Sequence, residues 1–332
     1  MYIVNSYPLA VALCVVTMLC WGSWANTQKL ASKNWSFPLF YWDYTLGLII
    51  LSLIFGLSLG STGASGQSFI SNLQAASGAS LGSAFIGGIV FNIANLLIVA
   101  AIDIAGMAIA FPIGIGLALV IGVIVNYLAT PVGNPTLLFT GVGLVSLAII
   151  LDALAYRKIS SRTASIRGIT ISIAGGILMG FFFRFVAASM SADFENPETG
   201  LLTPYTAVFI FSLGVFFSSF LFNSYFMYRP INGEKSTYRD YFKLGTPRLH
   251  LIGILGGIIW CVGMSFSLIA SEKAGYAISY GLGQGATMIA AIWGVFVWRE
   301  FKSAPPGTNL LLTLMFLSFL VGLALIIFAR IS

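Results

Sequence analysis

The sequence predicts an all-α integral membrane protein whose ten transmembrane helices form two inverted five-helix repeats. Three observations lead to this fold class. The 332 residues are 58% hydrophobic and only 8% charged, whereas soluble domains carry about 25% charged residues. The apolar residues gather in runs of about 20, the length that crosses a bilayer as a helix. A stretch of the chain also recurs at an offset of 169 residues.

The same composition argues against several other classes of protein. The net charge of +6 comes from basic residues in short loops between apolar runs, so we expect a lipid bilayer and no nucleic acid as partner. Cys14, Cys20 and Cys261 all lie inside apolar runs, which gives neither a disulfide framework nor metal-ligand spacing. We find no phosphate-binding loop and no nucleophile–base pair. We therefore expect no cofactor, no metal and no enzymatic activity.

Ten apolar runs are long enough to span a membrane. They lie near 6–27, 37–60, 82–103, 105–128, 135–155, 166–190, 203–228, 249–271, 274–298 and 308–329. The first run leads into tryptophans rather than a cleavage site, so we interpret it as a retained helix. Asp103 and Glu272 lie in two tight hairpins, at 103–105 and 271–274, and are expected to begin the fourth and ninth helices as N-caps rather than to bind a ligand. Segment 61–80 is rich in Gly, Ser and Ala and predicts a flexible connector.

The loops differ sharply in positive charge. Thirteen Lys and Arg residues lie in loops on one side of the predicted membrane, and only Lys273 and Arg330 lie on the other. Loops rich in Lys and Arg face the cytoplasm. This distribution predicts a protein of a bacterial-type plasma membrane with both termini facing outward.

The recurring stretch is the most informative feature. Residues 87–116 align without a gap on residues 256–285, with ten of thirty positions identical. Further positions match in character, namely Asp103/Glu272, Phe91/Trp260 and Phe111/Tyr280. The offset relates spans three and four to spans eight and nine, so the repeating unit has five helices. Because five is odd, the second copy enters the membrane from the opposite side, as in transporters that work by alternating access.

The two predicted units are residues 1–160 and 161–332. Within them, the sequence predicts a break near the middle of the fourth and of the ninth helix. The first break is expected at Pro112, Gly114 and Gly116, and the second at Gly281, Gly283 and Gly285. Proline removes a backbone donor, and paired breaks in matched helices indicate a binding site at the membrane midplane. The alternative is close helix packing through small residues.

Amide, hydroxyl and aromatic side chains inside the spans supply candidate binding groups. The candidates are Trp21, Trp24, Asn92, Asn95, Phe111, Trp260, Tyr280, Gln284 and Thr287. Amides beside aromatic faces suit a neutral, planar polar solute. Interhelical hydrogen bonds and core packing are the alternative interpretation for these residues.

Two acidic residues are candidates for proton coupling. Asp43 lies within the second span, and Glu300 lies at the end of the ninth. Carboxyl groups inside a membrane are costly and often relay protons. Asp43 could instead pair with Lys29 or Lys33, and Glu300 could form an interfacial ion pair. Arg184 either extends to the interface or faces the site.

Six short segments carry a family resemblance. They are Trp21–Trp24, Tyr41–Tyr44, Leu202–Ala207, Arg229-Pro230 with Gly233, Ala274–Ala277, and Trp293-Gly294 followed by Glu300. On these residues the chain resembles the drug/metabolite transporter superfamily, and within it the ureide permease and glucose/ribose porter group. The resemblance implies a central site and proton-coupled uptake, with the motif's acidic residues falling on Asp43 and Glu300. Arg184 is outside the recognised pattern.

Together these features predict a secondary transporter that imports a small neutral polar solute with protons. The resemblance favours a ureide or nucleobase-like compound, and a monosaccharide is the alternative. A metabolite exporter or exchanger, sodium as coupling ion, and a membrane receptor without transport are further alternatives. The chain is expected to be a monomer or homodimer.

Overall fold

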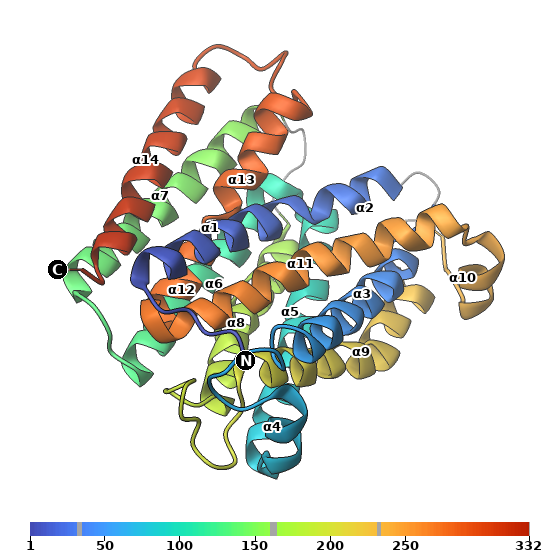
Figure 1. Cartoon of the computed structure of the whole chain (residues 1–332). Coiled ribbons are helices and arrows are strands. Elements are labelled where there is room, and N and C mark those ends of the chain that lie inside the picture. Colours follow the sequence, from blue (N-terminus) through green and yellow to red (C-terminus); the bar gives the residue numbers. More distant parts are fainter. Residues whose placement is uncertain (32–34, 160–164, 231–233, 332) are drawn as a thin grey trace.

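A computed structural model describes residues 1–31, 35–159, 165–230 and 234–331 (Figure 1). Lys33, Arg162 and Gly233 lie outside these residues. The described residues are mostly helical and contain no β-strand, only one isolated bridge between Met190 and Leu202. The predicted all-α fold class is therefore confirmed.

Ten helical spans within the described ranges are long and apolar enough to cross a membrane. In chain order they are α1 (Tyr7–Ser23) with α2 (Ala25–Ala31), α3 (Phe37–Leu57), α5 (Gly78–Ala105), α6 (Met107–Ala129), α7 (Pro135–Ile159), α8 (Ile166–Ser189), α9 (Pro204–Tyr228), α11 (Pro247–Ala274), α12 (Tyr276–Gly283) with α13 (Ala286–Ile292) and the π-helix η1 (Trp293–Val297), and α14 (Thr308–Phe328). The predicted number of spans is confirmed, with ends shifted by a few residues.

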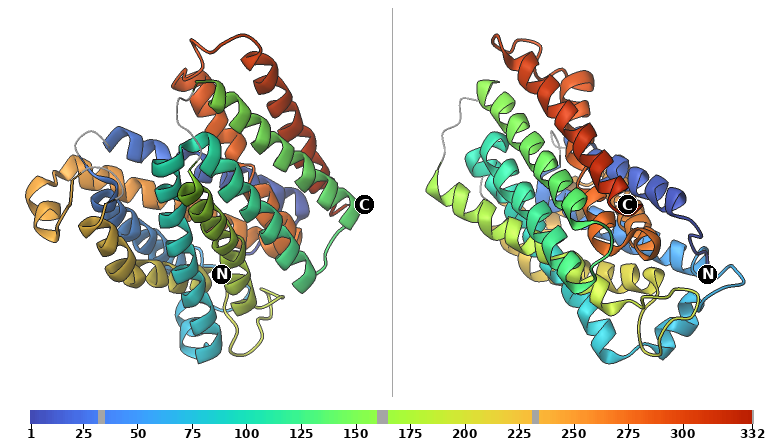
Figure 2. Two further views of the ribbon diagram at one scale, coloured as in Figure 1. Left: turned by 180° about the vertical axis from the view of Figure 1, so that it is seen from behind. Right: turned by 90° about the vertical axis from the view of Figure 1, so that its left-hand side faces the viewer.

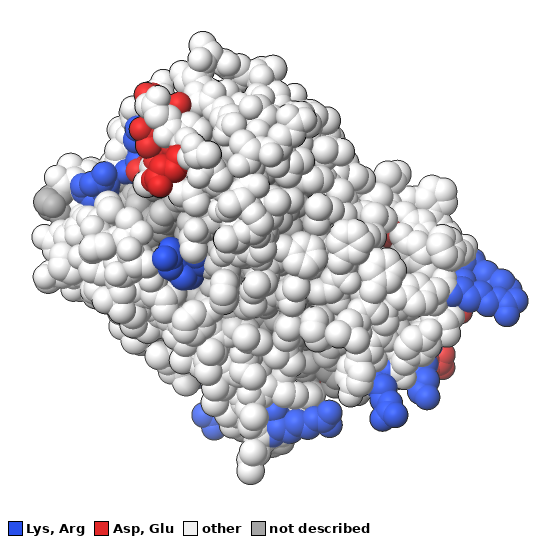
Figure 3. Space-filling view, turned by 90° about the horizontal axis from the view of Figure 1, so that it is seen from below, with Lys and Arg blue, Asp and Glu red and all other residues white. Residues whose placement is uncertain are grey.

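The outer surface of the bundle is apolar, as a lipid-facing surface should be. Large hydrophobic side chains such as Leu128, Ile166 and Leu221 are exposed. In Figure 3 charged side chains form a few groups separated by a broad surface without Lys, Arg, Asp or Glu. Exposed apolar area of this extent marks a membrane or partner surface rather than one facing water.

Glycines build the two tight hairpins that join spans three to four and eight to nine. Gly106 ends α5 with φ 81°, and Gly275 ends α11 with φ 86°. Only glycine adopts this region of backbone space readily. Asp103 and Glu272 therefore lie in the last turn of the preceding helix. The prediction that they cap the following helix is wrong, because the chain reverses at the glycine.

Segment 61–80 is more ordered than a flexible connector. It contains the short helix α4 (Phe69–Ala75), at whose start the Ser68 hydroxyl accepts the Ser71 N–H. Phe69 is buried, and the Ser77 N–H donates to the Gly200 carbonyl at 2.9 Å. The apolar Phe69 side chain gains burial by folding against the bundle, which composition alone did not reveal.

Glycines on both partners mark the crossing of α3 with α11 and that of α5 with α9. At the crossing of α3 and α11, a Cβ on Gly257 would overlap the Tyr44 carbonyl oxygen, and one on Gly47 would overlap the Ile254 carbonyl oxygen. Gly88 and Gly214 serve the crossing of α5 and α9 in the same way. Each crossing joins a helix before residue 160 to one after it. Figure 2 shows these helices packed in one bundle from two further sides.

Candidate functional site

Aromatic rings fill the centre of the bundle, where five helices meet. Trp260 on α11 stacks on Trp21 of α1, with ring centroids 5.7 Å apart, and on Phe211 of α9, at 5.8 Å. Phe91 of α5 lies 4.4 Å from Trp260 and 5.2 Å from Phe182 of α8. The residues matched by the sequence repeat, Phe91 and Trp260, thus touch each other. In this conformation the centre is closed by side chains.

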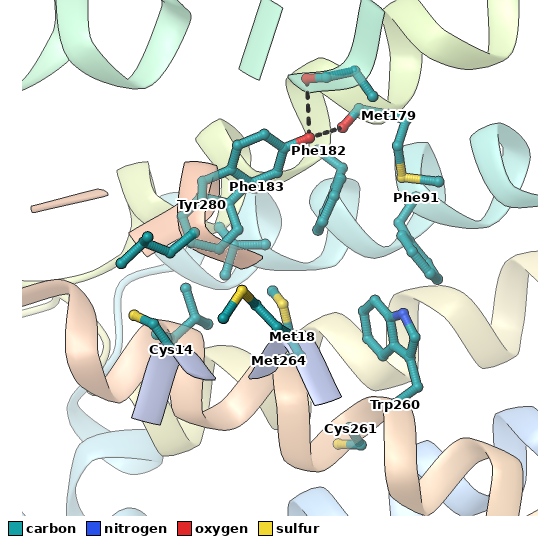
Figure 4. Close-up of a cluster of buried hydrophobic side chains, with 14 of the residues drawn as sticks. Cys14, Met18, Phe91, Met179, Phe182, Phe183, Trp260, Cys261, Met264 and Tyr280 are labelled. Atoms are coloured by element: carbon teal, nitrogen blue, oxygen red, sulfur yellow. Dashed lines mark hydrogen bonds between the residues drawn. The ribbon is translucent and has the colours of Figure 1, made fainter. Parts of the chain in front are cut away.

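Tyr280 extends this layer toward α6 and α8, as Figure 4 shows. It is fully buried, and its hydroxyl donates to the carbonyls of Ala118 and Met179 at 3.1 and 3.3 Å. Gly122 on α6 makes room for the ring, because a Cβ there would overlap it. Tyr280 therefore fixes the ninth span against two helices of the bundle.

A buried polar group lies between α3, α5 and α9. The Tyr41 hydroxyl donates to the Asn92 Oδ1 at 2.9 Å, and the Asn95 amide donates to the Tyr41 hydroxyl at 3.3 Å. The Asn92 amide donates to Ser218 and Ser219 at 2.7 and 3.2 Å. Both predicted amides thus face the bundle interior, where they make interhelical bonds in this conformation.

A ladder of rings connects Trp24 to this polar group. Trp24 forms the turn between α1 and α2, and its ring centroid lies 5.0 Å from that of Tyr44. Tyr44 in turn stacks on Tyr41 at 5.2 Å, with ring planes inclined by 17°. The predicted residues Trp24, Asn92 and Asn95 are therefore brought together through two tyrosines.

The predicted pair of helix breaks is only half present. The ninth span is divided at Gln284 and Gly285, and Thr287 donates to the Gln284 carbonyl at 2.9 Å across the break. In contrast, α6 runs unbroken through Pro112. Proline lies in the second turn of that helix, where its missing N–H frees a single carbonyl, and membrane helices tolerate such a loss.

The glycines near the expected breaks serve close packing. Gly176 of α8 lies against the Gly114 carbonyl, and a Cβ on Gly283 would lie 2.8 Å from the Trp21 ring. Segments 111–116 and 280–285 thus contact different neighbours. Phe111 is half-buried and, among the described residues, makes no ring contact with the central aromatic side chains. Its place in the candidate site is not supported.

Asp43 is the centre of a hydrogen-bonded cluster. Its carboxylate is buried and accepts bonds from the Trp35 indole at 3.1 Å and the Tyr241 hydroxyl at 2.5 Å, and it pairs with His250 Nδ1 at 2.8 Å. Tyr241 comes from the short helix α10 (Tyr238–Leu244) and His250 from the first turn of α11. A Cβ on Gly253 would overlap that of Asp43. The cluster therefore ties the second span to the chain beyond residue 230.

The Asp43 cluster also changes the ionisation of Tyr241, which lies outside the spans. Burial, and then the hydrogen bond to the Asp43 carboxylate, raise the pKa of the Tyr241 hydroxyl above its usual range. Because its pKa is raised, the Tyr241 hydroxyl keeps its proton at neutral pH and remains a hydrogen-bond donor.

Glu300 forms an ion pair with Lys29, with 2.8 Å between Oε1 and Nζ. The Tyr156 hydroxyl donates to Oε2 of the same carboxylate at 2.7 Å. The Lys29 ammonium also lies 4.1 Å from the Trp298 ring centroid. Lys29 thus pairs with Glu300, and the suggested pairing of Lys29 with Asp43 is wrong. Arg184 is half-buried near the C-terminal end of α8.

Five residues that the structure adds to these groups were not among the predicted site residues. They are Trp35, Tyr41, Tyr44, Tyr241 and His250. Tyr41 and Tyr44 flank Asp43 in the chain and could have been found from that position. His250, the only histidine of the sequence, gave a weaker signal because nothing local links it to Asp43.

With this geometry in place, comparison with known proteins decides the family. The model of the family described as ureide permease matches residues 40–164 and 155–329. The chain belongs to the ureide permease family. Ureide permeases 1 and 2 of Arabidopsis thaliana are each 24% identical to it, over 98% of both chains. A transmembrane protein 144 homologue of Dictyostelium discoideum is 27% identical over 52% of this chain and 42% of its own.

The fold also recurs in a protein of known crystal structure. That protein superposes with a TM-score of 0.62 and 14% identity, over 97% of this chain and 98% of its own. At this identity the likeness concerns the fold alone. As a member of the ureide permease family with ten candidate spans, the chain is a multi-pass membrane protein of transmembrane transport.

Proposed function

We propose that this ureide permease family member is a secondary transporter of ureides and related neutral, planar amides. The observation that carries the proposal is the grouping of amides and flat rings where helices before residue 160 meet α9 and α11, in a chain of this family. Amide side chains offer both donors and acceptors, which match the carbonyl and N–H groups of a ureide. The solute site would comprise Trp21, Trp24, Asn92, Asn95, Trp260, Tyr280, Gln284 and Thr287.

Alternating access between two inverted halves, 1–160 and 161–332, is the mechanism that we propose. The matched glycines Gly88 and Gly257 each receive a helix of the other half, and the matched Gly106 and Gly275 each end a helix at positive φ. These equivalences support an inverted repeat and placement in the drug/metabolite transporter superfamily. Inverted halves can exchange conformations and so expose a shared site to each side in turn.

Asp43 is the proposed proton-coupling group, and Glu300 is the second candidate. Protonation of Asp43 would remove the charge that attracts its three donors and weaken the tie from α3 to α10 and α11. A proton could therefore loosen one end of the bundle and favour its opening. Sodium in place of the proton remains the alternative for the coupling ion.

Transport by purified protein in liposomes tests this function. We expect labelled allantoin to enter faster when the proton gradient is directed inward, with the outside more acidic. We expect no uptake of labelled glucose under the same gradient. Asp43→Asn should lose gradient-driven uptake while it retains exchange of solute at equal pH. Asp193→Asn, an exposed carboxylate in the loop after α8, serves as the matched control.

Three outcomes would contradict parts of the proposal. Uptake of glucose but not of allantoin would favour the sugar alternative. Efflux of allantoin from loaded liposomes, driven by protons that move in the opposite direction, would favour an exporter. Unchanged gradient-driven uptake in Asp43→Asn would remove Asp43 from coupling.

A further inference from the structure

The Tyr44 hydroxyl is buried without a hydrogen-bond partner among the described residues. The whole side chain is fully buried in α3. Its neighbour Tyr41 bonds Asn92, and Tyr280 bonds two carbonyls. Buried polar groups in native proteins are almost always bonded, and each exception needs an explanation. Within a membrane span, bulk water is not at hand to supply the missing bond.

The surroundings of Tyr44 combine flat rings with amides. Its ring lies against Trp24 at 5.0 Å and stacks on Tyr41 at 5.2 Å. The Tyr41 hydroxyl then leads to Asn92 and Asn95. An unbonded hydroxyl thus lies in the part of the bundle where a planar ring could stack and where an amide network begins.

The backbone around Tyr44 is held closely. Gly257 of α11 approaches the Tyr44 carbonyl so nearly that a Cβ would overlap it. At the same crossing, Gly47 lies against the Ile254 carbonyl. These contacts fix the backbone of α3 from which the Tyr44 side chain extends.

We propose that the Tyr44 hydroxyl is a recognition group for the solute, which supplies the missing hydrogen bond when it binds. A phenolic hydroxyl donates and accepts, so it can meet either a carbonyl or an N–H of a neutral cyclic amide or ureide. The solute ring would stack on Trp24 or Tyr41 in the solute-bound conformation. This inference rests on the proposed function, and it assigns part of the transporter's selectivity for its solute to the Tyr44 hydroxyl.

The alternative is that Tyr44 only fills space. In that case phenylalanine should serve as well as tyrosine, because it keeps the ring and removes an unbonded hydroxyl. The two interpretations therefore predict opposite results for transport by Tyr44→Phe, while both predict that the variant folds.

The experiment measures allantoin uptake kinetics and thermal stability of purified wild type, Tyr44→Phe, Tyr41→Phe and Tyr225→Phe. Tyr225 is exposed on α9 and controls for the substitution itself. For Tyr44→Phe we expect an unchanged or higher melting midpoint and a KM for allantoin raised about tenfold or more, since a site built to bond a polar group discriminates strongly. Tyr41→Phe should instead melt at a lower temperature, because it loses its bonds to Asn92 and Asn95.

A KM for Tyr44→Phe within about twofold of wild type, with intact stability, would overturn the inference and leave the proposed function standing, because a bonding partner of the solute is worth more than that. Wild-type protein that moves none of allantoin, uracil and urea would overturn the proposed function, and this inference with it. The two failures are thus distinguishable by the behaviour of the wild type.

Discussion

The hydroxyl group of Tyr280 stabilises the packed centre of the bundle. Tyr280 is fully buried and donates to carbonyls of both α6 and α8. Tyr280→Phe keeps the ring and removes these bonds, so we expect a loss of about 1 kcal/mol in the free energy of unfolding. A lower melting midpoint in detergent measures it, with Tyr225→Phe as control. Equal midpoints for Tyr280→Phe and wild type would contradict this role.

The Tyr241–Asp43 bond gives a prediction about pH. Burial and the Asp43 carboxylate raise the pKa of Tyr241 above the ordinary value of about 10. A raised pKa means that the bond contributes fully below about pH 10 and is lost as the pH rises through the raised value. The difference in melting midpoint between wild type and Tyr241→Phe should therefore be the same at about pH 7 and pH 9. A difference that shrinks between these two values would refute the assignment.

At the scale of residues, the sequence identified the buried acid Asp43 but not the residues that bond it. Asp43 stands out because a carboxylate inside an apolar run needs a reason. Its partners Tyr241 and His250 lie 198 and 207 residues further along the chain. Only the lateral packing of α3, α10 and α11 brings them together, and no local pattern encodes that packing.

At the scale of helices, glycines at crossings should be sensitive and other glycines should not. Gly257→Ala would drive a methyl group into the Tyr44 carbonyl oxygen, and such overpacking costs about 1–3 kcal/mol. Gly116→Ala meets open space and should be neutral or stabilising by about 0.5–1 kcal/mol, because alanine favours the helix. Thermal melting of both variants compares them. A Gly257→Ala variant as stable as Gly116→Ala would show that the helices are not held at this distance.

Helix spans were predictable because apolar runs of sufficient length have few other uses in a chain of this composition. The hairpin glycines were also visible, since they recur at matched positions of the repeat. The break in α6 was predicted wrongly, because Pro112 lies in the second turn of its helix, where one lost bond is tolerated. The glycines around it serve packing on α8.

At the scale of the molecule, bonds between distant segments gather the loops at two ends. Lys29 with Glu300, Lys158 with the Pro306 carbonyl, and Asp43 with His250 lie at one end, which we call the basic end. The Met1 ammonium donates to the Ser65 carbonyl at the opposite end, at 2.5 Å. The repeat in the sequence predicted two halves, but it did not predict that helices before residue 160 pack on helices after it, α3 on α11 and α5 on α9.

The sidedness of these two ends yields a last prediction. The distribution of Lys and Arg predicts that the basic end faces the cytoplasm, so Ala64 should be outside and Lys302 inside; both side chains are exposed. A membrane-impermeant maleimide should label Ala64→Cys in intact cells and Lys302→Cys only after permeabilisation, in a background where Cys14, Cys20 and Cys261 are replaced by Ser or Ala. Leu221→Cys, exposed on α9 and facing lipid, should resist labelling in both cases. The reverse pattern would place both termini in the cytoplasm, and with it the Asp43 cluster at the outer surface, where a proton would enter rather than leave.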